Sequence, residues 1–332
     1  MPDEQKSGTS SHGGLLRRVS KGRKASTGPA PQELSILHRK KFGMSFYGWI
    51  LMPVIILLAA ITLYPFFWMI VKSFYHVATK PGQHDEWVGL KNYIGLFKDG
   101  LFLNGWWIQL RYVVISLVVE FVLGFALALF LNNLKRTANV ITTIILIPMM
   151  IAPVAVGFLH MYLFNSSFGW YHWFLKSVGL LSGGSILGDM EWAMAAIIIA
   201  DVWEWTPFMA LIFLAGLKKV PLDQLEAAKC DGAPPVKRFF DVVLPNMTSV
   251  IVIAVLIRFM DIMRYIDTIF VMTTGGPAGA TKTVSYYLFD VAFRYFEIGR
   301  GAAHGFVLLL VTIIIAQVFV SVMNKSRKGM AR

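Results

Sequence analysis

The chain has 332 residues, of which 56% are hydrophobic and only 15% are charged, and its formal net charge is +12. Soluble domains usually carry about 25% charged residues because their surfaces contact water, so this composition excludes an ordinary soluble domain. Nine of the basic residues lie in the first 46 positions, and most others lie in short segments between apolar blocks. This distribution is typical of charges that set membrane topology and argues against nucleic-acid binding.

Residues 1–45 are rich in Ser, Gly, Lys and Arg and are too polar to form a core, so we expect a basic, disordered cytoplasmic tail. The apolar block that follows is too long for the hydrophobic part of a cleavable signal peptide. Residues 42–71 contain no charged side chain over 30 positions, whereas a membrane-crossing helix needs about 20. Cys230 is the only cysteine, which excludes an internal disulfide and a cysteine-based metal site.

The chain contains six apolar blocks that predict six transmembrane helices in an all-α fold. Their approximate ranges are 47–73, 107–134, 138–163, 191–217, 245–272 and 301–323. Residues 46–324 would form this membrane domain, with a cytoplasmic loop at about 218–245 and a cytoplasmic tail at 325–332. Prolines are expected to break or kink several of the helices, at Pro65, Pro148, Pro153 and Pro207. Between the third and fourth blocks, Trp170 and Trp173 indicate an amphipathic segment at the headgroup level, followed by a loop.

The Lys and Arg residues predict the orientation. With the N-terminus in the cytoplasm, 20 of the 31 basic residues are cytoplasmic, eight are external and three lie within the spans. The reverse orientation would invert this bias, so both ends are expected in the cytoplasm of a bacterial inner-membrane protein.

The loop between the fourth and fifth blocks has the pattern of a helix, a sharp turn and a second helix. Pro221 suits the first turn of a helix, and Gly232 can adopt the left-handed conformation that closes one. Pro234 and Pro235 then restart the chain before a second apolar stripe. We therefore expect two short helices at the cytoplasmic surface.

This loop resembles the EAA loop of permeases in ATP-binding-cassette importers. The matching residues are Glu226-Ala227-Ala228, Asp231-Gly232-Ala233, Phe239 and Leu244-Pro245. Further matches to the carbohydrate branch, the maltose-transporter type, are Trp87–Tyr93, Tyr265–Phe270, Thr274–Pro277, Ala292-Phe293 and Phe296. The resemblance covers nearly all of residues 47–323.

The resemblance implies a type I importer permease with six membrane helices, whose loop is a coupling helix that docks on a separate ATPase subunit. It assigns ATPase coupling to Glu226, Ala227, Ala228, Asp231, Gly232, Phe239, Leu244 and Pro245. It also implies a second, similar permease subunit, an extracytoplasmic solute-binding protein and a carbohydrate substrate. ATP and Mg would be bound by the ATPase subunits, and no cofactor by this chain. Transport would follow from ATP-driven alternating access.

Charged residues within the predicted spans are the candidates for the substrate path. Asp201 and Glu204 share a face of span four, and Arg258, Asp261, Arg264 and Asp267 recur at the same spacing in span five. These charges either pair for packing or line a hydrophilic cavity, since charges at membrane depth usually face partners or water. Neighbouring aromatics favour a sugar path, and the candidates are Trp203, Glu204, Trp205, Phe208, Asp261, Arg264 and Tyr265. Glu120, in span two, is expected to be structural.

The alternative function is an ion-coupled secondary transporter that uses the intramembrane carboxylates as proton or sodium sites. Six spans without an internal repeat and the docking loop argue against it. The sequence has no phosphate-binding G-x-x-x-x-G-K-[ST] motif and no nucleophile or metal-ligand cluster, and His160 is isolated in span three. The chain is therefore not expected to be an enzyme by itself.

Overall fold

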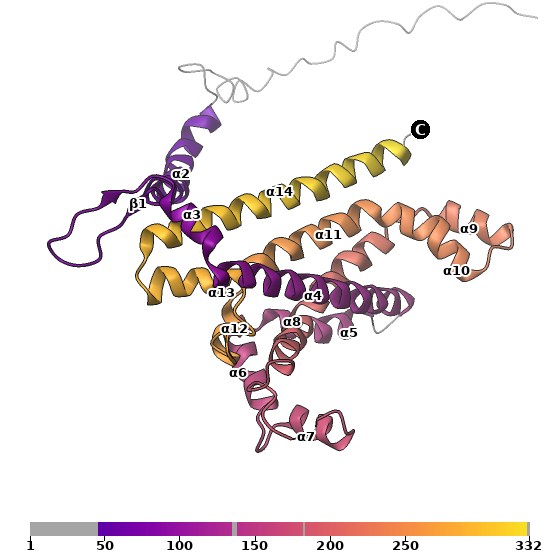
Figure 1. The fold of residues 1–332 in the computed structure, drawn as a ribbon. Helices are drawn as coiled ribbons and strands as arrows, with labels where there is room; N and C mark the ends of the chain where they lie inside the picture. Colours follow the sequence, from indigo (N-terminus) through magenta and orange to yellow (C-terminus); the bar gives the residue numbers. More distant parts are fainter. Residues whose placement is uncertain (1–45, 135–137, 182, 331–332) are drawn as a thin grey trace, which may run out of the picture. The chain divides into compact units, whose positions relative to one another are not determined.

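The computed structural model describes residues 46–134, 138–181 and 183–330, so the predicted basic tail at 1–45 lies outside the described residues. The chain divides into two units, one that ends at Tyr64 and one that begins at Pro65. Apart from the short antiparallel strands β1 (Tyr75–His76) and β2 (Glu86–Trp87), the described elements are helices (Figure 1). The predicted all-α class is therefore confirmed.

The helices follow the apolar blocks of the sequence, with shorter elements between them. The long ones are α2 (Phe46–Lys72), α4 (Gly100–Asn133), α8 (Trp192–Leu217), α11 (Leu244–Arg264) and α14 (Ile298–Met330). The shorter ones are α3 (Lys91–Lys98), α5 (Ala138–Ile145), η1 (Pro148–Met150), α6 (Pro153–Leu163), α7 (Trp170–Ser177), α9 (Leu222–Cys230), α10 (Pro235–Arg238), α12 (Asp267–Met272) and α13 (Val284–Phe289). Two π-helical turns, η2 (Phe239–Val243) and η3 (Asp290–Arg294), continue α10 and α13.

Five helical stretches in the described part of the chain are long and apolar enough to cross a membrane. They contain five of the six predicted spans, whereas the third is not a single long helix. Its break agrees with the expected effect of Pro148 and Pro153. Residues 138–163 form α5, the 3₁₀ turn η1 and α6, because Pro148 and Pro153 each begin a new helical segment. Pro65 and Pro207, by contrast, lie within α2 and α8, which continue past them as α-helix.

The predicted fifth span, 245–272, contains a break. The helix α11 ends at Arg264, the backbone is extended at Tyr265, and α12 begins only at Asp267. The last predicted span is longer than expected, because α14 continues through the proposed cytoplasmic tail as far as Met330.

The core of the unit from Pro65 onward is built on the pair α4 and α8. Gly124 brings the two backbones together, because a β-carbon at this position would lie 2.7 Å from Cβ of Met209. Phe125 and Phe213 fill the same interface with ring centroids 5.2 Å apart. The helix α11 packs on α4 and α8, and α14 lies along α11 (Figure 1). The helices α4, α8 and α11 thus pack around a common interior.

Candidate functional site

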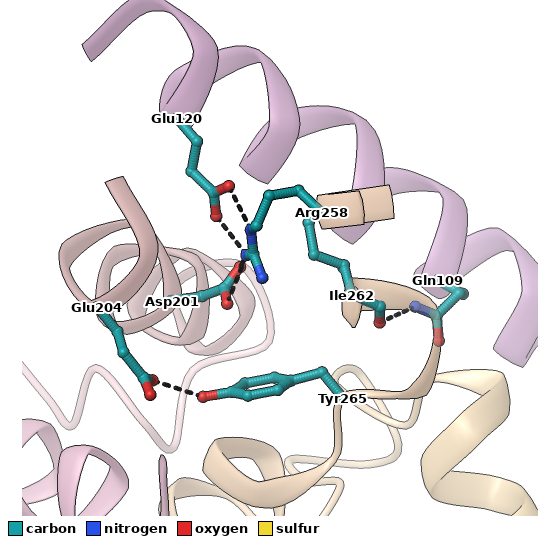
Figure 2. A network of polar contacts seen from close by, with 7 residues as sticks. All are labelled: Gln109, Glu120, Asp201, Glu204, Arg258, Ile262 and Tyr265. Carbon is teal, nitrogen blue, oxygen red and sulfur yellow. Dashed lines mark hydrogen bonds and ion pairs between the residues drawn. The ribbon is translucent and has the colours of Figure 1, made fainter. Parts of the chain in front are cut away.

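A buried ion network joins α4, α8 and α11 (Figure 2). Arg258 of α11 donates from Nε to Oε2 of Glu120 at 2.7 Å and from Nη2 to Oε1 at 2.5 Å. Both side chains are fully buried. This two-pronged geometry matches a planar guanidinium to a carboxylate and fixes α11 against α4.

Asp201 of α8 is the second acid in the network. Nη2 of Arg258 lies 3.1 Å from its Oδ1 and 3.2 Å from its Oδ2, and the Asp201 side chain is also fully buried. The guanidinium carbon lies 5.0 Å from the ring centroid of Trp205, within the range of a cation–π contact. Arg258 is therefore held by two acids and one aromatic ring, from two other helices.

A second polar contact lies beside the first. The hydroxyl of Tyr265 donates to Oε2 of Glu204 at 2.7 Å, and Gln109 Nε2 donates to the Ile262 carbonyl at 3.1 Å. The break after Arg264 gives Tyr265 an extended backbone at the end of α11, and its hydroxyl meets α8 (Figure 2). A continuous helix, as the sequence predicted, would not place this residue at a helix end.

The structure brings four of the seven predicted substrate-path residues to this network, and a fifth, Trp203, lies apart from it. Glu204 and Tyr265 are bonded to each other, Trp205 lies on Arg258, and Phe208 meets Trp205 edge-on at 6.2 Å. Trp203 lies on another side of α8, with its ring 5.2 Å from His160.

The other two predicted path residues form a separate ion pair. Arg264 donates to Asp261 at 2.6 Å, one helical turn away, and the Arg264 side chain is 79% exposed. Among the described contacts none joins this pair to Glu204. Their place in a path with Glu204 stays a prediction.

The sequence interpretation missed Gln109 and Tyr112, although a signal was present. Gln109, Tyr112, Ser116 and Glu120 recur every three or four residues along α4, and all four are buried. This spacing places them on one helix face. A polar stripe in an otherwise apolar helix would have predicted that span two contributes to a buried polar interior.

The network contains polar atoms that have no hydrogen-bond partner in the described part of the chain. They include Tyr112 Oη, Glu204 Oε1, Arg258 Nη1 and Trp205 Nε1. Such buried atoms are costly unless something satisfies them, so they mark a position where solute hydroxyls or water could bond. Across residues 46–134, 138–181 and 183–330, no group of three metal-ligating side chains is found.

The loop between α8 and α11 has the predicted helix–turn–helix form. The helix α9 closes at Gly232, which has φ of +73°, and the Ala233 N–H donates to the Ala228 carbonyl at 3.0 Å. This is the glycine-closed helix end that the sequence indicated. Pro235 begins α10, and Leu244 and Pro245 begin α11 after the π-helical turn.

We call residues Leu222–Phe240 the docking segment. Its inner side is anchored, because Phe239 packs edge-on against Phe125 of α4 with centroids 5.4 Å apart. Its outer side exposes Leu222, Val236 and Phe240, with 70%, 68% and 57% of their surfaces accessible. Glu226, Ala227 and Asp231 are also exposed, whereas Ala228 is half-buried. An apolar face of this kind, held on a rigid base, is typical of a protein-binding surface.

Residues 120–328 match the sequence pattern of a protein family described as "Binding-protein-dependent transport system inner membrane component". The chain belongs to this family. It is a multi-pass inner-membrane transport component, and the matched region includes the docking segment and the carboxylates of the buried network.

Individual relatives extend the similarity toward the N-terminus. The chain is 31% identical over 288 residues to a probable ABC transporter permease protein, y4oQ, of Sinorhizobium fredii, covering 85% of this chain and 91% of the relative. It is 36% identical over 212 residues to the trehalose/maltose transport system permease protein MalF of Thermococcus litoralis, covering 64% of this chain and 70% of the relative.

A solved structure shares the fold. A chain from a bacterial ABC transporter involved in the import of the acidic polysaccharide alginate superimposes with a TM-score of 0.71 at 21% identity. The match covers 84% of this chain and 96% of that chain. The predicted type I importer permease arrangement is thereby confirmed.

Proposed function

We propose that this chain is a membrane-spanning permease subunit that moves a carbohydrate into the cytoplasm, powered by ATP hydrolysis in separate subunits. The docking segment carries the proposal. Its exposed apolar face, Leu222, Val236 and Phe240, lies on a base that Phe239 ties to the core. A force applied to this segment is transmitted to α11, which continues from it without a loop.

Partners follow from this assignment. ATPase subunits would cover the docking segment, a second, similar permease would complete the path, and an extracytoplasmic binding protein would deliver the solute. ATP and Mg would be held by the ATPase subunits. Both termini of this chain would lie in the cytoplasm, on the same side as the docking segment.

Carbohydrate is the proposed cargo because of the aromatic side chains near the carboxylates and because of the solutes for which the relatives are named. Tyr265 bonds Glu204, Trp205 lies on Arg258 and Phe208 meets Trp205, and aromatic faces beside acceptors suit sugar rings and their hydroxyls. Relatives at 28–36% identity are named for trehalose, maltose and sulfoquinovosyl glycerol transport.

The secondary-transporter alternative assigns proton or sodium binding to the same carboxylates. In the structure Glu120 and Asp201 both accept hydrogen bonds from Arg258, and Glu204 accepts one from Tyr265. At Glu120 and Asp201 a cation would have to compete with a guanidinium already in place. This favours a packing or solute-contacting role for these acids.

The test is transport by the complex that this chain forms with its ATPase subunits, second permease and binding protein, reconstituted in proteoliposomes. We expect uptake of radiolabelled trehalose or maltose that requires ATP and the binding protein. Uptake driven by a proton or sodium gradient without ATP would contradict the proposal and support the alternative.

A further inference from the structure

A pocket of about 400 Å³ lies around α7, away from the buried network. Its volume is within the range of about 300–1,000 Å³ for small-molecule sites. The residues that matter for its chemistry are Ser166, Phe168, Trp170, His172, Trp173 and Lys176. Phe168, Trp170 and Trp173 expose 69%, 58% and 63% of their surfaces, so flat aromatic faces are available at this pocket.

The pocket also contains a polar group that lacks a partner. His172 is only 7% exposed, and its Nδ1 has no hydrogen bond within the described residues. Neither packing nor solvent explains a buried ring nitrogen without a partner, because its desolvation is uncompensated. A ligand hydroxyl, either directly or through one water, would supply the missing bond.

Aromatic contacts hold α7, the helix that carries the pocket, against its neighbours. Tyr171, on the inner side of α7, lies 4.9 Å from the Phe164 ring and 6.0 Å from His160. His160 in turn lies 5.2 Å from Trp203, the neighbour of Glu204. Two rings therefore connect the pocket helix to the candidate substrate path, whereas Trp170 is fixed on the outer side by stacking on Phe174 at 5.7 Å.

The chain direction places this pocket opposite the docking segment. The helix α7 precedes α8, the docking segment follows α8, and 26 residues of α-helix span about 39 Å. With the docking segment in the cytoplasm, the pocket belongs to the outer half of the protein, the side on which solute arrives.

We propose that the α7 pocket is an external binding subsite for pyranose sugars, distinct from the buried network and in ring contact with its border. The inference rests on the proposed function and deepens it. Sugar rings present apolar C–H faces to Trp170 and Trp173, and their hydroxyls bond His172, Ser166 and Lys176. The subsite would hold the incoming sugar before it reaches Glu204 and Tyr265.

A lipid headgroup is the competing occupant, because Trp and Lys also favour the membrane interface. The described lining favours sugar on two counts. Lys176 is the one lysine or arginine among the lining residues, so a headgroup phosphate would find a single fixed cation there. The second point is the ring contacts from Tyr171 through His160 to Trp203, which link the pocket to the candidate substrate path. A sugar on its way to that path would use this link, whereas a lipid headgroup would not.

The experiment measures protection of a thiol in the pocket. In a Cys230→Ser background, Ser166→Cys would be labelled by a membrane-impermeant maleimide in right-side-out vesicles that contain the whole importer but no binding protein. Trehalose, maltose and sodium glucuronate are the pyranose probes, each at 50 mM, and mannitol is the acyclic control. We expect at least one pyranose to slow labelling about fivefold and mannitol to leave it unchanged, as expected for a site mostly occupied at this concentration.

Matched variants distinguish protection by a sugar bound in the pocket from general effects of sugar on the protein or on the labelling reaction. Trp173→Ala should abolish the protection, whereas Trp107→Ala, which removes another exposed tryptophan outside the pocket, should keep it. A Lys80→Cys reporter in the exposed β1–β2 connection should be labelled equally with and without sugar.

Three results would overturn the proposal. Ser166→Cys could resist the impermeant reagent, which would mean that the pocket is not external. Alternatively, none of the three pyranoses could slow labelling, although the same vesicles take up trehalose or maltose with ATP once binding protein is added. Labelling could instead respond to the phosphatidylglycerol content of the vesicles and not to sugar, which would identify a headgroup site. Absence of ATP-driven uptake by the unmodified complex would instead contradict the proposed function itself. Failure of the pocket proposal and failure of the proposed function are therefore distinguishable.

Discussion

At the scale of single residues, Arg258 has the most demanding position in the molecule. It is fully buried in a helix that crosses the membrane, and Glu120 and Asp201 surround its guanidinium. A buried charge persists only with well-placed partners, and removing one partner leaves the others uncompensated. Arg258 therefore holds α4, α8 and α11 in one arrangement.

Arg258→Met is expected to destabilise the protein by about 3–5 kcal/mol, because Glu120 and Asp201 would remain buried without a cation. The measurement is the temperature at which detergent-solubilised protein loses its monodisperse peak. Arg264→Met is the matched control in the same helix, where an exposed pair is worth at most about 1 kcal/mol. Equal shifts for the two variants would contradict the structural role of Arg258.

The Tyr265–Glu204 bond carries the prediction about the substrate path. Tyr265→Phe removes the hydroxyl at 2.7 Å from Glu204, and Glu204→Gln removes the charge at similar size. Each should lower uptake about tenfold, equivalent to about 1.4 kcal/mol, while the importer still assembles. The readouts are radiolabelled uptake and the yield of co-purified subunits. If yield falls in parallel with uptake, the bond serves packing and not the path.

Asp261 and Arg264 extend this test. The sequence pattern predicts the same transport loss for Asp261→Asn and Arg264→Gln, since both were assigned to the path. Their geometry as an exposed pair predicts a smaller loss than Glu204→Gln. Uptake by the four variants, measured side by side, decides between these expectations.

At the scale of elements, the docking segment is a preformed surface that continues into α11. The helix α9 ends at Cys230 and is closed by Gly232, and α10 continues through the π-helical turn η2 into α11, which carries Arg258. Such turns occur often at functional sites in helices. Movement of the segment would therefore reach the buried network through one continuous helical path.

Gly232→Val and Glu226→Lys are expected to uncouple the permease from its ATPase. A β-carbon at Gly232 would meet no atom within 4 Å, so the cost of valine comes from its φ of +73°, about 1–3 kcal/mol of strain. Glu226→Lys reverses an exposed charge on α9. Both variants should insert normally but lose transport and binding-protein-stimulated ATP hydrolysis, and ATPase subunits should co-purify poorly with them.

Gly232→Asn is the matched control, because asparagine tolerates the left-handed conformation that valine does not. It should retain most of the stimulated hydrolysis. Full stimulated hydrolysis and uptake by purified Gly232→Val or Glu226→Lys complexes would exclude this segment as the coupling element.

At the scale of the whole molecule, the number of membrane crossings determines on which side each end of the chain lies. The odd number of long helices in the described chain does not by itself place the two ends on the same side. The region 138–163 determines whether both ends are cytoplasmic, because α5, η1 and α6 must together cross the membrane for this to hold. Their combined length of 26 positions permits this.

Reporter fusions measure the topology directly. A reporter after Arg332 or inserted between Lys135 and Arg136 should read as cytoplasmic, and one near Gly279 as external, because the basic residues favour the cytoplasmic side. An external reading within Leu222–Phe240 would contradict the docking of that segment on an ATPase.

The sequence by itself determined the membrane class, four continuous long helices and the form of the docking segment. These features depend on local chemistry: long apolar runs, a proline that begins a helix, and a glycine that closes one. Each acts within a few residues of where it occurs. For this reason Gly232 could be assigned a left-handed backbone from the sequence, and the structure places it at φ of +73°.

Only the tertiary structure decided which charges meet. Glu120 and Arg258 are 138 positions apart, and Asp201 and Arg258 are 57 apart. The sequence placed charges on helix faces but could not choose between pairing and lining a cavity, because that choice depends on how α4, α8 and α11 are rotated against one another. The break at Tyr265 was equally hidden, since no proline or glycine marks it. Side chains far apart in the chain, packed against one another between the helices, determine the site.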